Sequence, residues 1–298
     1  MKVLITGGKG QLGYECEKIF ATEHETKAID IDELDITNFE KVESFVLNYK
    51  PDIIINCAAY TMVDACETDK AKAWDVNVRG PRNLAEISSK YNIKLVHIST
   101  DYVFDGNRKI PLPYKEIDAP KPLSYYGKTK FEGEEAINSA LDKYIILRTA
   151  WLYGINGQNF FKTILRIALK KQSQKDESPI KVVNDQFGSP TWVYTLALQI
   201  KKLIENNGNG LYHATSEGYC SWYDFAKYFL SKMNIPHKII PCSTEEFPRP
   251  ASRPKNSILE NERLKLEGMN VMNDWQYDVD EFISQYHDLL IYEQMKVI

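Results

Sequence analysis

The chain has 298 residues, of which 43% are hydrophobic and 26% charged, and its formal net charge is −4. A length near 300 allows one large α/β unit or two domains, each with an ample core. The mild acidity, with no basic block, argues against nucleic acid as a partner. No apolar run approaches the roughly 20 residues that cross a membrane, and the first residues do not read as a signal peptide, so we expect a cytoplasmic protein.

The cysteines are isolated in the sequence and form neither a CxxC pair nor a metal-ligand spacing with a histidine. They are Cys16, Cys57, Cys66, Cys220 and Cys242. Scattered thiols in odd number are typical of a reducing compartment. We therefore expect free cysteines that pack as small hydrophobic side chains.

The first half of the chain alternates short apolar runs with amphipathic segments. Strands are predicted at KVLITG, KAID, PDIIINCAA, KLVHIST and YIILRTAW, with helices between them at 11–21, 38–49, 65–76, 80–91 and 126–141. The run PDIIINCAA is continuously apolar, which is typical of a strand buried on both faces. This order predicts an α/β fold, a Rossmann-type doubly wound parallel sheet, in which ligands bind beyond the carboxyl ends of the strands.

The second half is more mixed in its predicted elements. We expect a polar loop at 170–179, a strand at 180–185, a helix at 191–207 and a strand at 210–216. A further helix is predicted at 221–234 with Ser221 as its N-cap, and the proline-rich segment 247–257 resists regular structure. Residues 1–151, rejoined by about 186–216, are expected to form the sheet domain. Residues 152–185 and 217–298 are expected to form a smaller mixed α/β lobe that closes over it.

A glycine motif lies between the first strand and the first helix. In ITGGKGQLG, the residues Gly7, Gly10 and Gly13 have GxxGxxG spacing. Glycines permit a tight turn there and let backbone N–H groups approach a pyrophosphate at the helix N-terminus. The alternative is an ordinary strand-to-helix turn, and the βαβ context favours a dinucleotide site.

An acidic residue at the end of the second strand fits the same site. Asp30 follows Gly13 by 17 residues and could accept hydrogen bonds from the adenosine ribose. It would repel a 2′-phosphate, which favours NADH over NADPH. Asp32, Glu33 and Asp35 lie close by in the sequence and are alternatives for this role.

Small residues end the third strand in NCAAYT, residues 56–61. Ala58 and Ala59 leave room for a flat ligand against the backbone, although close helix packing would explain them equally well.

The segment YGKTK places Tyr126 and Lys130 four residues apart, on one face of a predicted helix. An ammonium beside a phenol lowers the phenol pKa from about 10, which would make Tyr126 a proton donor or acceptor near neutral pH. The lysine could also hold the nicotinamide ribose. At the end of the fourth strand, Thr100 would hold a carbonyl oxygen opposite Tyr126, and Ser99 is the alternative for that role.

Together the glycine motif, NCAAYT, STDYVFDG and YGKTK resemble the extended short-chain dehydrogenase/reductase family over nearly the whole chain. Within that family, the segments GQLG, AAYTMVDACE, STDYVFDG, RTAWLYG, DQFGSPT and SRPKNS are similar to the reductases of dTDP-4-keto-6-deoxyhexoses. The resemblance implies that NADH or NADPH reduces the C4 keto group of dTDP-4-dehydro-L-rhamnose. It also implies an NAD(P)-binding first domain, a substrate-binding second lobe, and a monomer or homodimer.

The resemblance assigns roles to individual residues. It implies Thr100, Tyr126 and Lys130 as the catalytic set, with Asp101 on the sugar hydroxyls. The residues expected to line the dinucleotide are Gly7, Gly10, Gln11, Leu12, Gly13, Asp30, Asp35, Ile36, Ala58, Ala59, Tyr60, Thr61, Tyr126 and Lys130. Trp151 is expected to flank the sugar, although core packing at a lobe boundary is an alternative. Arg253 is a diphosphate candidate or else a surface arginine.

Sugar-nucleotide dehydratases of the same superfamily carry an Asp-Glu pair after the threonine, because eliminating water needs an additional acid and base. Here the pair is Asp101-Tyr102, which favours a reductase. Some of the similar reductases dimerise through magnesium held by glutamates, and Glu15 matches one such position. The segment Trp192-Val193-Tyr194 lacks the acid expected for another ligand, so we expect no metal and a solvated Glu15.

Two other functions fit the sequence. The regulatory subunit of methionine adenosyltransferase is similar to this group and serves as a binding partner without turnover. A reductase or epimerase of another nucleotide sugar is the second alternative.

Overall fold

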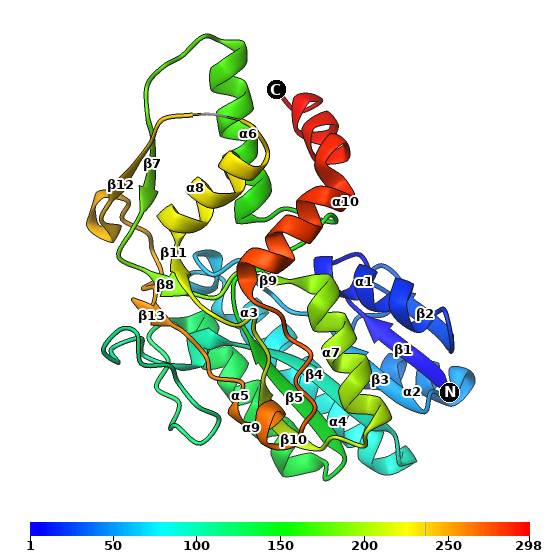
Figure 1. The fold of residues 1–298 in the computed structure, drawn as a ribbon. Helices are drawn as coiled ribbons and strands as arrows, with labels where there is room; N and C mark the ends of the chain where they lie inside the picture. The colour runs from blue at the N-terminus through cyan, green and yellow to red at the C-terminus, as the bar shows by residue number, and fades with distance from the viewer. Residues whose placement is uncertain (236) are drawn as a thin grey trace.

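The computed structural model describes residues 1–235 and 237–298. Its centre is a six-stranded parallel sheet in the order β10–β5–β4–β3–β1–β2 (Figure 1). The strands are β1 (Lys2–Thr6), β2 (Glu25–Ile29), β3 (Ile53–Asn56), β4 (Lys94–Thr100), β5 (Tyr144–Thr149) and β10 (Gly210–His213). The predicted doubly wound parallel sheet is confirmed.

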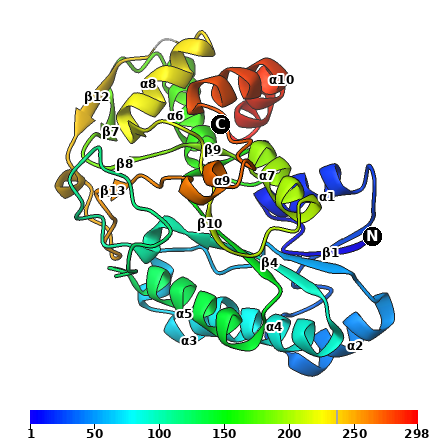
Figure 2. The ribbon, with the colours of Figure 1, turned by 60° about the horizontal axis from the view of Figure 1, so that its bottom comes forward.

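Helices cover both faces of this sheet, as Figure 2 shows. One face carries α2 (Phe39–Tyr49), α3 (Lys70–Trp74), α4 (Gly80–Tyr91) and α5 (Tyr125–Ala140), and the other carries α1 (Gln11–Phe20) and α7 (Val193–Glu205). Short 3-10 turns lie at Ala65–Glu67, Asp101–Val103 and Thr244–Glu246, and a π-helical turn at Asp75–Arg79 joins α3 to α4. The strand order reverses between β1 and β3, so their carboxyl ends leave a crevice where such folds bind ligands.

The sheet is buried from both sides, which explains its continuously apolar strands. All four residues of β3 are buried, as the run PDIIINCAA predicts. On one face the sheet packs with α2 and α4 around residues such as Leu4, Ile54 and Leu84. On the other face it packs with α1 and α7 and continues into the second lobe.

That lobe is built from three longer helices and short strand pairs. The helices are α6 (Phe160–Ser173), α8 (Trp222–Lys232) and α10 (Trp275–Met295), with the short α9 (Glu262–Leu266) near β10. The strands form the pair β7 (Ile180–Val183) with β12 (Ile239–Cys242), the pair β6 (Leu152–Tyr153) with β9 (Thr191–Trp192), and the set β11 (Cys220–Ser221), β8 (Phe187–Gly188) and β13 (Asn256–Ser257). The aromatic side chains of Tyr153, Phe161, Phe225 and Phe282 meet in its core.

Two features of this lobe differ from the sequence prediction. The expected loop at 170–179 was wrong in its first four residues, because α6 continues to Ser173. The side chain of Asn159 caps the start of α6. The apolar face of this helix, which includes Leu165 and Leu169, is buried. The helix α10 was not predicted at all. The predicted N-cap Ser221 is confirmed, with a capping box to Asp224 at the start of α8.

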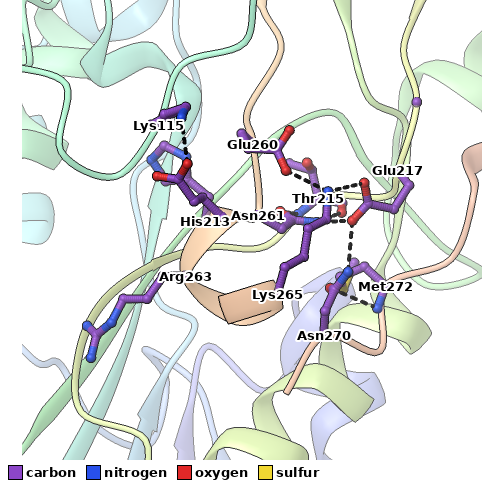
Figure 3. Close-up of polar contacts among 12 residues, drawn as sticks. Lys115, His213, Thr215, Glu217, Glu260, Asn261, Arg263, Lys265, Asn270 and Met272 are labelled. Carbon is purple, nitrogen blue, oxygen red and sulfur yellow. Dashed lines mark hydrogen bonds and ion pairs between the residues drawn. The ribbon is translucent and has the colours of Figure 1, made fainter. Parts of the chain in front are cut away.

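A polar cluster around Glu217 attaches the segment after β13 to the edge of the sheet (Figure 3). The carboxylate of Glu217 accepts hydrogen bonds from Asn261 (3.1 Å), Asn270 (2.8 Å) and Lys265 (2.8 Å). The Asn261 amide also bonds both the N–H and the carbonyl of Thr215, just after β10. These bonds fix the chain that leads from the second lobe across β10 to α10.

Within residues 1–235 and 237–298, no helix has the length and apolar character needed to cross a membrane. All five cysteines belong to this part of the chain and are free; four are buried and Cys57 is partly buried. The division into a sheet domain and a smaller lobe at the predicted boundaries stays a prediction.

Candidate active site

One cavity of about 750 Å³ opens at the carboxyl ends of the parallel strands. Every residue that the sequence assigns to the site, apart from Arg253, lines it, whereas the alternatives Asp32 and Glu33 do not. These residues are Gly7, Gly10, Gln11, Leu12, Gly13, Asp30, Asp35, Ile36, Ala58, Ala59, Tyr60, Thr61, Thr100, Asp101, Tyr126, Lys130 and Trp151. The fold therefore brings together motifs that are separated by up to 144 positions in the sequence.

The glycine turn is built as its sequence requires. Gly7 has φ +69°, and a Cβ there would lie 2.6 Å from the backbone nitrogen of Ala58. The N–H of Gly10 closes the turn on the Gly7 carbonyl at 3.0 Å. The helix α1 then begins at Gln11 without a side-chain cap. Residues Gln11–Gly13 of its first turn line the cavity, so the positive end of the helix lies there.

The acidic residues after β2 lie at one end of this cavity. The carboxylate of Asp30 accepts hydrogen bonds from the N–H groups of Lys9 (3.0 Å) and Ile31 (2.8 Å), which fixes it beside the glycine turn. Asp35 also lines the cavity, but one of its oxygens is engaged by Thr37. The alternative Asp32 does not line the cavity and instead pairs with the amine of Lys9.

The loop after β3 is held against α5 by a buried amide. The Asn77 side chain accepts from the N–H of Tyr60 (2.8 Å) and donates to its carbonyl (3.1 Å). The same amide donates to the Thr129 hydroxyl at 3.1 Å. Asn77 thereby fixes the wall of the cavity formed by Ala58–Thr61 relative to the helix that carries Tyr126.

The end of β4 forms the floor of the cavity. Thr100 and Asp101 are buried there, and the Thr100 hydroxyl donates to the Asp101 carboxylate at 2.9 Å. Burial raises the pKa of Asp101 to about 6, against hydrogen bonds from Ser257 and Thr100 that favour the charged form. The alternative Ser99 also lines the cavity, but its hydroxyl donates to the buried Glu134 carboxylate.

The expected lowering of the Tyr126 pKa was wrong. Burial raises the pKa of this phenol above its ordinary value, the Asp101 carboxylate raises it further, and a hydrogen bond with Thr100 opposes them. The physical reason is that the Lys130 amine is directed elsewhere: its nitrogen donates to the Ile98 carbonyl at 2.6 Å and lies 3.2 Å from His97 Nε2. Burial also lowers the pKa of Lys130 to about 8.

Two tryptophans form the wall on the side of the second lobe. Trp151 follows β5 with φ +50°, an uncommon conformation for a residue other than glycine. Its ring stacks on Trp222 of α8 with centroids 3.4 Å apart and planes 8° apart. A Cβ at Gly188 would lie 2.7 Å from the Trp151 ring, which explains a glycine in the DQFGSPT segment.

Arg253 lies outside the cavity lining. Its guanidinium makes a bidentate ion pair with Asp64, with nitrogen–oxygen distances of 3.0 and 2.9 Å. The pair holds the pKa of Asp64 below its ordinary value. Arg253 is therefore not part of the cavity lining, but it lies close enough for its charge to act on Tyr102, which is.

The expectation of a solvated Glu15 was also wrong. Only 2% of this side chain is exposed, because α1 packs on α7, and the carboxylate pairs with Lys18 at 3.2 Å. In the part of the chain that the structure describes, no three His, Cys, Asp or Glu side chains are grouped to hold a metal ion.

Several residues of the site were missed by sequence reasoning. Trp222 and Gln158 line the cavity from the second lobe, and Asn77 and His97 support it from behind. No short motif marks Trp222, because its stacking partner lies 71 positions earlier. His97 lies in the strand KLVHIST, and a polar residue in an otherwise apolar buried strand indicates a side chain that needs a hydrogen-bond partner.

The chain is similar to proteins of known activity over nearly its whole length. A dTDP-4-dehydrorhamnose reductase of Aggregatibacter actinomycetemcomitans is 40% identical, and the match covers 92% of this chain and 96% of that protein. A probable dTDP-4,6-dihydroxy-2-methyloxan-3-one 4-ketoreductase of Streptomyces antibioticus is 39% identical, covering 93% of this chain and 92% of that protein.

Solved structures agree with this similarity. A dTDP-4-dehydrorhamnose reductase from Clostridium acetobutylicum has a TM-score of 0.91 and 44% identity, covering 96% of this chain and 99% of that one. The reductase from Bacillus anthracis, solved in complex with NADP, has a TM-score of 0.90 and 42% identity, covering 95% and 99%. The family model described as the RmlD substrate binding domain matches residues 1–288, and the chain belongs to this family.

Proposed function

We propose that the chain reduces the C4 keto group of dTDP-4-dehydro-L-rhamnose to give dTDP-L-rhamnose, with NADH or NADPH, in the cytoplasm. One observation carries this proposal. Thr100, Tyr126 and Lys130 line the same cavity as the glycine turn, in a chain 40% identical to a dTDP-4-dehydrorhamnose reductase. A proton donor and a dinucleotide cradle are the parts that a carbonyl reduction needs.

The cavity suits a nicotinamide dinucleotide, which supplies the hydride when it is bound. The glycine turn and the uncapped start of α1 would hold the pyrophosphate. Asp30 would accept hydrogen bonds from the adenosine ribose, which favours NADH, while the walls at Ala58–Thr61 would flank the ring system. Lys130 would reach the second ribose.

Tyr126 would donate the proton to the C4 oxygen while Thr100 holds that oxygen. Burial keeps the phenol protonated near neutral pH, which suits a donor. An ammonium on Lys130 would stabilise the phenolate as the proton leaves. Because Asp101 is followed by Tyr102 rather than a second acid, the site supports reduction and lacks the additional acid of a dehydratase.

The sugar would lie between Asp101 and the wall formed by Trp151, with Asp101 accepting from its hydroxyls. Arg253 stays a diphosphate candidate only if the nucleotide displaces its ion pair with Asp64. We also propose that the protein is a monomer or a homodimer without a bridging magnesium. Size-exclusion chromatography with and without a chelator tests that assembly.

The test of the reaction follows loss of the reduced nicotinamide with dTDP-4-dehydro-L-rhamnose, with the product identified by NMR. We expect turnover and an L-rhamnose product. The relative from Streptomyces niveus is a dTDP-4-keto-6-deoxy-D-glucose reductase, so that sugar is the matched competitor. Faster turnover of this competitor would show that the chain reduces another nucleotide sugar in preference to dTDP-4-dehydro-L-rhamnose. Dinucleotide binding without any turnover would favour a regulatory subunit like that of methionine adenosyltransferase.

A further inference from the structure

A row of polar side chains crosses the buried centre of the sheet and ends at Lys130. Thr6, Asn56 and His97 are register partners on β1, β3 and β4, and all three are buried. The Thr6 hydroxyl donates to Asn56 Oδ1 at 2.7 Å, and Asn56 Nδ2 lies 2.9 Å from His97 Nδ1. His97 Nε2 lies 3.2 Å from the Lys130 amine.

A backbone group fixes the direction of hydrogen bonding in this row. The N–H of Ala58 can only donate, and it points at Asn56 Oδ1 from 3.2 Å. The other end of the Asn56 amide is then the NH₂ group, which donates to His97 Nδ1. An imidazole nitrogen that accepts a hydrogen bond carries no proton, so a neutral His97 carries its proton on Nε2.

That proton faces the Lys130 nitrogen. An ammonium has three donors and no acceptor, so it cannot accept a hydrogen bond from His97. A neutral amine can donate to the Ile98 carbonyl at 2.6 Å and still accept from His97 Nε2. The row therefore stabilises one protonation state of Lys130 over the other.

We propose that His97 is a positioning residue that favours the neutral amine of Lys130 in the unliganded protein. The inference rests on the proposed role of Lys130 in the reductase. Other groups also act on this amine. Burial lowers the Lys130 pKa, while the Glu134 carboxylate on the next turn of α5 and the Cys57 thiol at the end of β3 act in the opposite direction. His97 itself stays neutral, because burial and Lys130 lower its pKa.

The first test observes the His97 tautomer directly. The ¹⁵N chemical shifts of the ring nitrogens distinguish Nε2–H from Nδ1–H in the unmodified protein without ligands, and His97→Gln assigns the signal. We expect the Nε2–H tautomer at pH 7. Observation of Nδ1–H, or of both nitrogens protonated, would overturn the proposal whether or not any variant folds.

The second test uses the pH dependence of kcat/KM, which reports the protonation of the free enzyme, because the ammonium form of Lys130 supports proton transfer. His97→Leu removes the Nε2–H donor, so the basic limb should move to higher pH by about one unit. His97→Gln keeps an acceptor for Asn56 and a donor for Lys130, so its basic limb should stay close to that of the unmodified protein. An unmoved limb in His97→Leu would contradict the proposal.

The matched control is His213→Leu, because His213 is also fully buried in the sheet but lies on β10, which β5 separates from the His97 strand β4. We expect the basic limb of His213→Leu to be unchanged. A shift equal to that of His97→Leu would show a general effect of losing a buried histidine and would contradict the proposal. The tautomer measurement needs no turnover. Absence of turnover at every pH therefore counts against the proposed reduction and leaves the His97 result standing.

Discussion

At the end of β4, the phenol of Tyr126 lies beside Thr100 and Asp101 in a buried corner of the cavity. If this phenol donates the proton, Tyr126→Phe should lower kcat by about 10²–10⁴-fold, the usual contribution of a general acid. The affinity for NADH should stay nearly unchanged, because the ring remains. Stopped-flow turnover and fluorescence titration of NADH measure the two effects separately.

The control for this variant is Tyr102→Phe, because Tyr102 is a second, partly buried phenol whose ring packs edge-on against Tyr126 at 5.5 Å. Its loss of kcat should be much smaller. An unchanged kcat in Tyr126→Phe would remove Tyr126 from the role of proton donor.

The preference between NADH and NADPH depends on the charge beside the adenosine ribose. Asp30→Ala removes a carboxylate that would repel a 2′-phosphate, so the ratio of kcat/KM for NADH to that for NADPH should fall. Asp32→Ala is the matched control, because Asp32 lies two residues on, outside the cavity lining. If Asp30→Ala leaves the ratio of kcat/KM values unchanged, another acidic residue accepts the hydrogen bonds of the adenosine ribose.

Asp101 should make stability depend on pH. Its folded pKa is about 6 against an ordinary 3.8, so the folded protein holds an additional proton between these values. The free energy of unfolding should therefore fall as pH rises from about 4 to about 6, by up to about 3 kcal/mol from this group. Asp101→Asn should show a flatter profile in urea unfolding across this window, and parallel profiles would contradict the assignment.

At the scale of elements, a buried ion pair joins α5 to β5 behind the catalytic face. The Arg148 guanidinium donates to Glu134 at 2.6 and 3.0 Å, and both side chains are at most 4% exposed. Arg148→Met leaves the Glu134 carboxylate buried and unpaired, which should cost about 3–5 kcal/mol in denaturant unfolding. Adding Glu134→Leu removes the orphaned charge, so the double variant should recover most of the loss. A double variant less stable than the single would contradict this account.

The same elements show what the sequence can predict. Continuously apolar runs such as that of β3 and the helical spacing of Tyr126 and Lys130 identify elements and one shared face, because both are local patterns. The pairing of Glu134 with Arg148, and of Asn56 with His97, depends on which strand lies next to which. Strand order is a property of the whole sheet, so no local pattern carries it. Similarly, the low Tyr126 pKa was expected from a neighbouring charge, whereas burial decides its direction.

At the scale of the whole molecule, the cavity lies where the sheet meets the second lobe. The glycine turn, the acids after β2 and the end of β4 belong to segments whose motifs are contiguous, and the sequence predicts them together. The opposite wall is formed by Trp222 on α8, which reaches the cavity only because the lobe folds back over the sheet (Figure 1). A surface assembled from two such distant segments has no local signal in the sequence.

The stacked pair of Trp151 and Trp222 therefore allows a test of whether α8 contributes to binding of the sugar while the sheet side binds the dinucleotide. Trp222→Ala removes one ring of a stack that lines the cavity, so KM for the dTDP-sugar should rise by about tenfold, in line with the usual contribution of an aromatic contact. The dissociation constant for NADH should change little, because the glycine turn and Asp30 lie on the sheet side. Trp222→Phe keeps a smaller aromatic face, so its KM for the dTDP-sugar should lie between those of the unmodified protein and Trp222→Ala. Steady-state kinetics and NADH titration on the three proteins measure this, and an equal loss of NADH affinity would mean that α8 supports the dinucleotide rather than the sugar.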